Sequence, residues 1–170
     1  MGRTTDVAGR VHRAYAWGQD GQIHYRRSGP EGARSPLLLL HAAHGSSAVF
    51  ESVMSEMGRE RSVIAPDLPG AGMSDPLNGH GSISDQAVAL LEIVAELGLG
   101  MVDVLGAGDG GSIAIEMARQ QPEVVRKIIL ISAPAPQGLL SQPILALNAP
   151  HFPRTQVDEI LFAARNFLDN

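Results

Sequence analysis

Short apolar runs alternate with segments of helix length along the middle of this chain. The runs are apolar throughout, which is typical of strands that other elements cover on both faces. The segments between them carry apolar residues at the i, i+3, i+4, i+7 spacing of a helix face. This order predicts an α/β fold, a mostly parallel sheet with helices on both faces. Strands are expected at Pro36–Leu40, Ser62–Ala65, Val102–Leu105 and Lys127–Ile131, and helices at Ser47–Arg59, from Ser82 to Gly98, and at Gly110–Gln121.

Both ends of the chain differ from this alternating middle. Near the N-terminus, Val11–Trp17 and Gln22–Arg27 are separated by turn residues, which predicts an antiparallel strand pair. After Ser132 the chain becomes rich in proline, and it closes on an amphipathic helix. We therefore expect residues 1–135 to form a core and residues 136–170 to begin a helical cap segment.

Composition excludes several classes of function. With 44% hydrophobic and 18% charged residues the chain is not expected to be disordered. Thirteen basic against eighteen acidic residues disfavour a nucleic-acid partner, because phosphate binding needs a basic face. The absence of cysteine excludes a disulfide scaffold and a thiolate nucleophile. No apolar run is long enough to span a membrane, and the first residues lack a hydrophobic signal core, so a soluble cytoplasmic protein is expected.

A glycine-rich junction joins the third of these strands directly to a helix, and two functions use glycines there. Gly106, Gly108 and Gly111 match the G-x-G-x-x-G loop of nucleotide-binding or S-adenosylmethionine-binding proteins. Gly106 and Gly110 match the outer glycines of a nucleophile elbow, with Gly108 in the place of the nucleophile. A dinucleotide site needs a carboxylate at the end of the next strand, and the segment Ile131–Ala133 has none. The elbow is therefore the favoured interpretation.

Four segments in order carry a family resemblance. The chain resembles the N-terminal part of α/β-hydrolases of the epoxide hydrolase, haloalkane dehalogenase and C–C hydrolase type, over roughly residues 11–135. The resemblance implies an α/β-hydrolase fold that stops after its sixth strand, and hydrolysis of a small ester, epoxide or similar substrate. The segments are Leu37–Ser47, Val63–Asp75, Gly106–Gly111 and Val124–Pro134.

The resemblance also implies where the chemistry belongs. The family places a Ser or Asp nucleophile at the elbow apex, where this chain has Gly108. Asp109 is the nearest candidate nucleophile, and its alternative role is to cap the helix or face solvent. The oxyanion hole is made by backbone N–H groups, for which Asp109 and either Ala42 or Ala43 are the candidates.

The family's acid and histidine come after the nucleophile in the sequence. Here His151 is the one histidine after the elbow, and it lies in proline-rich sequence. The 170-residue chain is therefore expected to be weakly active or inactive, and two alternatives remain. One is a catalytically dead or truncated family member that binds a small molecule, and the other is a nucleotide- or S-adenosylmethionine-binding enzyme.

His41 and His44 have an H-x-x-H spacing that raises the question of a metal. Zinc needs three or four ligands, and completing the set would require Asp67, His80 or Asp109. We expect His41 to be a buried structural histidine instead, with no metal and no cofactor. Asp67 and Asp75 are expected to make hydrogen bonds within their loop.

The strand Lys127–Ile131 raises the question of a partner. Its residues after Lys127 are apolar on both faces, and no obvious strand follows to cover it. An uncovered edge of this kind exposes unpaired N–H and C=O groups, and the proline-rich stretch after it is poorly suited to pair as a strand. We therefore expect a homodimer or pairing with a partner at this strand.

Overall fold

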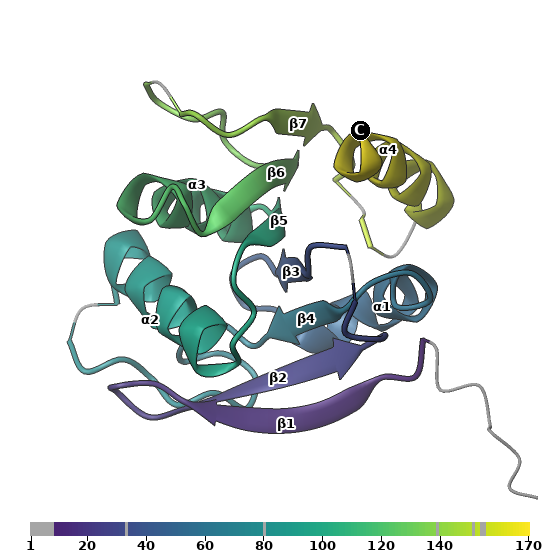
Figure 1. Ribbon diagram of the computed structural model, residues 1–170. Coiled ribbons are helices and arrows are strands. Elements are labelled where there is room, and N and C mark those ends of the chain that lie inside the picture. Colours follow the sequence, from purple (N-terminus) through teal and green to yellow (C-terminus); the bar gives the residue numbers. More distant parts are fainter. Residues whose placement is uncertain (1–8, 33, 80, 139, 151, 154–155) are drawn as a thin grey trace, which may run out of the picture.

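The computed structural model describes residues 9–32, 34–79, 81–138, 140–150, 152–153 and 156–170 (Figure 1). Strands and helices alternate along most of this part of the chain, as the sequence predicts. The strands are β1 (His12–Trp17), β2 (Gln22–Ser28), β3 (Leu37–Leu40), β4 (Val63–Pro66), β5 (Val102–Ala107), β6 (Val125–Ile131) and β7 (Ile144–Leu147). The helices are η1 (Ser47–Phe50, a 3₁₀ turn), α1 (Glu51–Met57), α2 (Ile83–Glu96), α3 (Asp109–Gln120) and α4 (Val157–Asp169).

The described strands form a single sheet in the order β1-β2-β4-β3-β5-β6-β7. β1 and β2 are antiparallel, β2 is antiparallel to β4, and the pairs from β4 to β7 are parallel. Helices α2 and α3 lie on one face and α1 and α4 on the other (Figure 1). The predicted mostly parallel sheet with an antiparallel N-terminal pair is therefore confirmed.

Strand β3 shows why the short runs are apolar throughout. All of its residues are buried, and because side chains alternate between the faces, Leu38 and Leu40 enter the core under α2 and α3. Leu37 and Leu39 enter the second core, under α1 and α4. Each fully buried leucine contributes about 1.5–3 kcal/mol relative to an exposed one, so a polar residue on either face would be costly.

The proline-rich segment contains a seventh strand, which corrects two expectations. β7 pairs in parallel with β6, with Ile144 opposite Ile128 and Leu147 opposite Ile131. The prediction that β6 is an uncovered edge is therefore wrong, as is the prediction that the fold stops after its sixth strand. The prolines do not prevent pairing because Pro143 immediately precedes β7, where its carbonyl accepts the Ile128 N–H at 3.0 Å. Association with a partner or a second copy stays a prediction, without the uncovered edge that motivated it.

Helix α4 packs on the same core as α1, on one face of the sheet. Ile160, Leu161, Ala164 and Leu168 are buried in the cluster that also holds the residues of α1. The described part of residues 136–170 thus extends the sheet and its outer helical layer, while the assignment of this segment to a cap stays a prediction. Among the described helices, none is both long and apolar enough to cross a membrane.

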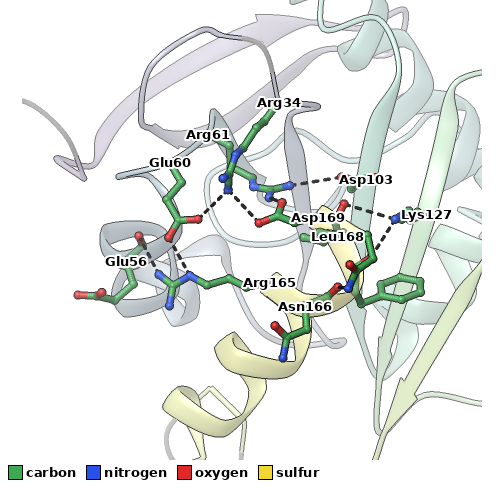
Figure 2. Close-up of polar contacts among 12 residues, drawn as sticks. Arg34, Glu56, Glu60, Arg61, Asp103, Lys127, Arg165, Asn166, Leu168 and Asp169 are labelled. Carbon is green, nitrogen blue, oxygen red and sulfur yellow. Dashed lines mark hydrogen bonds and ion pairs between the residues drawn. The ribbon is translucent and has the colours of Figure 1, made fainter.

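Buried charges fix the last turn of α4 against the starts of β5 and β6 (Figure 2). Asp103 is fully buried and accepts two hydrogen bonds from Arg126, at 2.8 and 2.6 Å. The buried Arg61 contacts Asp103 at 3.5 Å and is also ion-paired with Asp169. Lys127 donates to the Phe167 carbonyl at 2.8 Å. Cations at a helix C-terminus are favourable, so this cluster holds α4 at the end of the sheet opposite the glycine junction.

Candidate functional site

Gly108 forms the apex of the turn between β5 and α3. Its backbone has φ 53° and ψ −121°, and Asp109 begins the helix. This positive φ places the elbow in the frame predicted from Gly106 and Gly110, with Gly108 in the place of the nucleophile. Asp109 follows the apex and does not occupy it. A residue other than glycine is strained in this conformation, so the turn is built for a residue without a side chain.

The other glycines of the junction are required by close packing. A Cβ on Gly106 would lie 2.4 Å from the Gly110 carbonyl oxygen, and a Cβ on Gly110 would lie 2.3 Å from the Leu40 carbonyl oxygen. A Cβ on Gly111 would lie 2.3 Å from the Cβ of Ala133. These separations are impossible for real atoms, so any side chain would push α3 away from the strands. The glycine spacing is thus explained by helix–strand packing, without a bound phosphate.

Ala42 lies directly against the apex. A Cβ built on Gly108 would be 3.1 Å from the Cβ of Ala42, closer than ordinary van der Waals contact. The strain of a side chain at Gly108 would therefore have two sources, the positive φ and the methyl group of Ala42.

His41 fixes the orientation of the peptide that joins Ala42 to Ala43. The Leu68 N–H donates to His41 Nε2 at 2.9 Å, so Nδ1 carries the hydrogen and donates to the Ala42 carbonyl at 2.8 Å. The same carbonyl accepts the Gly45 N–H at 3.1 Å, which closes a tight turn. The C=O and N–H of one trans peptide point in opposite directions, so the Ala43 N–H is held pointing away from these partners. Burial lowers the pKa of His41, which preserves the neutral tautomer that this arrangement needs.

The Ala43 N–H meets the carboxylate of Asp109. Asp109 Oδ2 accepts this N–H at 3.2 Å, across 66 positions of sequence. Of the predicted oxyanion-hole groups, the structure therefore places the Ala43 amide beside the elbow and directs it at an anionic oxygen. Asp109, the candidate nucleophile, is hydrogen-bonded to the Ala43 amide. It lies in the first turn of α3, where the helix dipole also favours a carboxylate.

Two cavities flank the turn that carries Ala43. The larger, about 490 Å³, lies toward α2 and includes Asp109, His44, Gln86 and Ile83 in its lining. The smaller, about 260 Å³, is mainly apolar and is lined in part by Val49, Phe50, Ala107, Pro150 and Phe152. The sequence did not predict the roles of Ile83, Gln86, Pro150 and Phe152, because tertiary packing alone brings α2 and the segment after β7 to the elbow.

Comparison with known proteins identifies the family. The family model described as alpha/beta hydrolase fold matches residues 35–168. The chain belongs to the α/β-hydrolase fold family. This agrees with the sequence resemblance and with the order of the strands.

Similar proteins include hydrolases of several kinds. The chain is 33% identical over 106 residues to a 2-hydroxy-6-oxo-2,4-heptadienoate hydrolase of Pseudomonas putida, covering 60% of this chain and 38% of that protein. It is 32% identical over 111 residues to a soluble epoxide hydrolase of a Corynebacterium species, covering 65% and 37%. The solved structure of an N-acyl homoserine lactonase complexed with N-butanoyl homoserine matches with a TM-score of 0.67 at 35% identity, covering 72% and 45%. The chain spans about a third to two fifths of the length of the curated relatives it matches.

In this α/β-hydrolase chain the expected loop carboxylates are structural. Asp67 is buried and accepts hydrogen bonds from the Ser47 N–H, the Ser47 hydroxyl, the Met73 N–H and His24 Nδ1, at 2.6 to 2.9 Å. Burial raises the pKa of Asp67, but these hydrogen bonds outweigh it and lower the pKa overall. Asp75 accepts the Gln22 N–H at 2.8 Å. The prediction of hydrogen bonds within the loop is confirmed for Asp67, which accepts the Met73 N–H, whereas the Asp75 carboxylate bonds instead to the first residue of β2.

The described residues contain no group of three or more potential metal ligands. His41 has both ring nitrogens engaged in hydrogen bonds, so it has no free lone pair for a metal. Two histidines named from the sequence, His80 and His151, lie outside the residues that the structure describes.

Proposed function

We propose that this α/β-hydrolase chain binds a small ester or a similar neutral carbonyl compound at the Ala43 amide. The proposal rests mainly on one observation, the Ala43 N–H held beside the elbow and directed at an oxygen atom of Asp109. A carbonyl oxygen of a ligand in the 490 Å³ cavity would replace that carboxylate oxygen. A fixed N–H donor polarises a carbonyl and stabilises the negative charge that develops when it is attacked.

We further propose that residues 1–170 hydrolyse such a ligand slowly. Gly108 has no side chain, so the apex provides no nucleophile. Enzymes that lose their nucleophile retain catalysis from binding and oxyanion stabilisation alone, at a cost of at least about 10³-fold in rate. We therefore expect the chain chiefly to bind small esters or similar neutral carbonyl compounds, and to hydrolyse them only slowly.

The relatives support a small-molecule ligand. Their names describe hydrolases of 2-hydroxy-6-oxo-2,4-heptadienoate, of epoxides and of an N-acyl homoserine lactone, which are all small organic molecules. Among these compounds the lactone, which is a cyclic ester, fits the Ala43 N–H best. Its carbonyl oxygen accepts a hydrogen bond in the plane of the ester group. The adjacent apolar cavity offers space for an alkyl chain beside the carbonyl.

A second candidate function is slow hydrolysis by Asp109 itself. The observation that favours it is a carboxylate in the wall of the larger cavity, at the residue next to the apex. Displaced from the Ala43 N–H by a ligand, this carboxylate is able to accept a proton from an attacking water.

Titration of the ¹⁵N-labelled chain with ethyl butanoate tests the proposed function. We expect the Ala43 amide resonance to shift to saturation, with smaller changes around Gly108. Unchanged resonances throughout the segment 41–45 at the solubility limit of the ester would refute binding at this site.

A further inference from the structure

We infer that Asp109 makes this site selective for neutral ligands over anionic ones. The inference rests on the proposed function, because it concerns the ligand that replaces Asp109 at the Ala43 amide. Two features of the site carry it: the position of the carboxylate and the charges around the larger cavity.

The position of the carboxylate makes it an internal competitor. Asp109 Oδ2 already accepts the Ala43 N–H, so an incoming oxygen gains that hydrogen bond only when the carboxylate gives it up. Asp109 belongs to the first turn of α3, and the neighbouring Gly110 packs closely against the Leu40 carbonyl, which fixes the backbone position of this turn. Because the aspartate side chain is short and its backbone is held in place, the displaced carboxylate remains near the ligand.

The charges around the cavity give the competitor its selectivity. None of the described residues that line the 490 Å³ cavity is Lys or Arg, whereas Asp109 contributes a negative charge. His41 supplies no positive charge, since burial lowers its pKa and both nitrogens are hydrogen-bonded. His44 is the other histidine of the lining, so a carboxylate ligand would face the like charge of Asp109 with no Lys or Arg among the described lining residues as a counter-ion. Two like charges about 4 Å apart repel enough to weaken binding at least about fivefold even when water screens them fully.

This selectivity has a consequence for turnover. A neutral ester is accepted, while its acid product carries a carboxylate next to Asp109. The negative charge of Asp109 weakens binding of the acid product and does not weaken binding of the neutral ester. Slow hydrolysis would therefore not be limited by product inhibition.

Binding of butanamide and butanoate tests the inference, because the two probes match in size and differ in charge. Both are titrated at pH 7.5 into the ¹⁵N-labelled chain, into Asp109→Asn, and into Glu123→Gln, with Kd taken from the Ala43 amide shift. Asp109→Asn keeps an oxygen that accepts the Ala43 N–H. Glu123→Gln removes an equal charge from an exposed residue near the start of β6, away from the site.

We expect the native chain and Glu123→Gln to bind butanamide at least about fivefold more tightly than butanoate. Asp109→Asn should reduce that ratio at least about fivefold, mainly through tighter binding of butanoate. An unchanged ratio in Asp109→Asn, with butanamide still shifting Ala43, would refute the inference and leave the proposed function intact. If neither probe shifts Ala43 in any of the three proteins, the proposed function itself fails, and the inference with it.

Discussion

Adding a side chain at Gly108 should destabilise the fold by an amount that depends on residue 42. In Gly108→Ala the new Cβ forces a non-glycine residue into φ 53°, ψ −121°, which costs about 1–3 kcal/mol. The same Cβ meets the Ala42 methyl at 3.1 Å, and over-packing of this kind adds about 1 kcal/mol or more. Ala42→Gly removes the methyl and should recover the second contribution but not the first.

A double-mutant cycle separates the two contributions. The free energy of unfolding is measured by urea denaturation for the native chain, Gly108→Ala, Ala42→Gly and the double variant. We expect Gly108→Ala to be less destabilising by about 1 kcal/mol when residue 42 is glycine. Gly98→Ala is the matched control, because Gly98 has φ 61° with no atom within 4 Å of a built Cβ. It should cost about 1 kcal/mol whatever residue 42 is.

Additivity would contradict this reasoning. If the two substitutions add to within about 0.3–0.5 kcal/mol, the Ala42 methyl does not exclude a side chain from the apex. The elbow would then be open to a nucleophile, and Gly108→Ser alone would fit without a partner change.

Three further predictions concern pH, the buried charges and the sheet edge. Because the pKa of His41 is lower in the folded protein than in the unfolded chain, His41 binds a proton in the unfolded chain at a higher pH than in the folded protein. The free energy of unfolding should therefore be fully maintained above about pH 6.5 and should fall as the pH is lowered below that value. His41→Asn should flatten this fall in urea denaturation between pH 5 and 7, and an equal slope in both proteins would contradict it. Asp103→Ala should cost about 3 kcal/mol, because Arg126 loses both of its hydrogen bonds to this carboxylate and the buried Arg61 is left with Asp169 as its ion-pair partner. Glu123→Ala should cost about 0.5 kcal/mol or less, and equal costs would show that the cluster does not hold α4. The Ile128 N–H, bonded to the residue before β7, should exchange slowly in a dilute chain that light scattering shows to be monomeric, and fast exchange there would mean that β7 does not cover β6.

The fold was largely predictable because its signals are local. A few adjacent residues suffice to identify each of these signals: the apolar strands, the helix spacing of α1, and the capping box of Ser82 and Asp85. β7 is not predicted from the sequence, because the proline content of the whole segment argues against strand pairing. The prolines flank the strand at Pro143 and Pro150, and the residues between them keep their N–H groups.

The sequence predicts the backbone conformation of the site, but it does not predict the side-chain contacts and cavity walls around it. The positive φ of Gly108 and the buried state of His41 follow from the strand–glycine–helix pattern and the family resemblance. The contact between Asp109 and the Ala43 N–H does not, because it depends on how closely α3 approaches the turn after β3. The same is true of Gln86 and Phe152, whose place in the cavity walls depends on how whole elements pack.

Ester turnover is the measurement that tests the central claim most directly, that the elbow with Gly108 at its apex binds a carbonyl group without covalent catalysis. The release of 4-nitrophenol from 4-nitrophenyl butanoate is compared for the native chain, Asp109→Asn and buffer alone. We expect turnover at least about 10³-fold below that of a relative with an apex nucleophile. Robust turnover by the native chain that is abolished in Asp109→Asn would contradict the account, because Asp109 would then be the catalytic group.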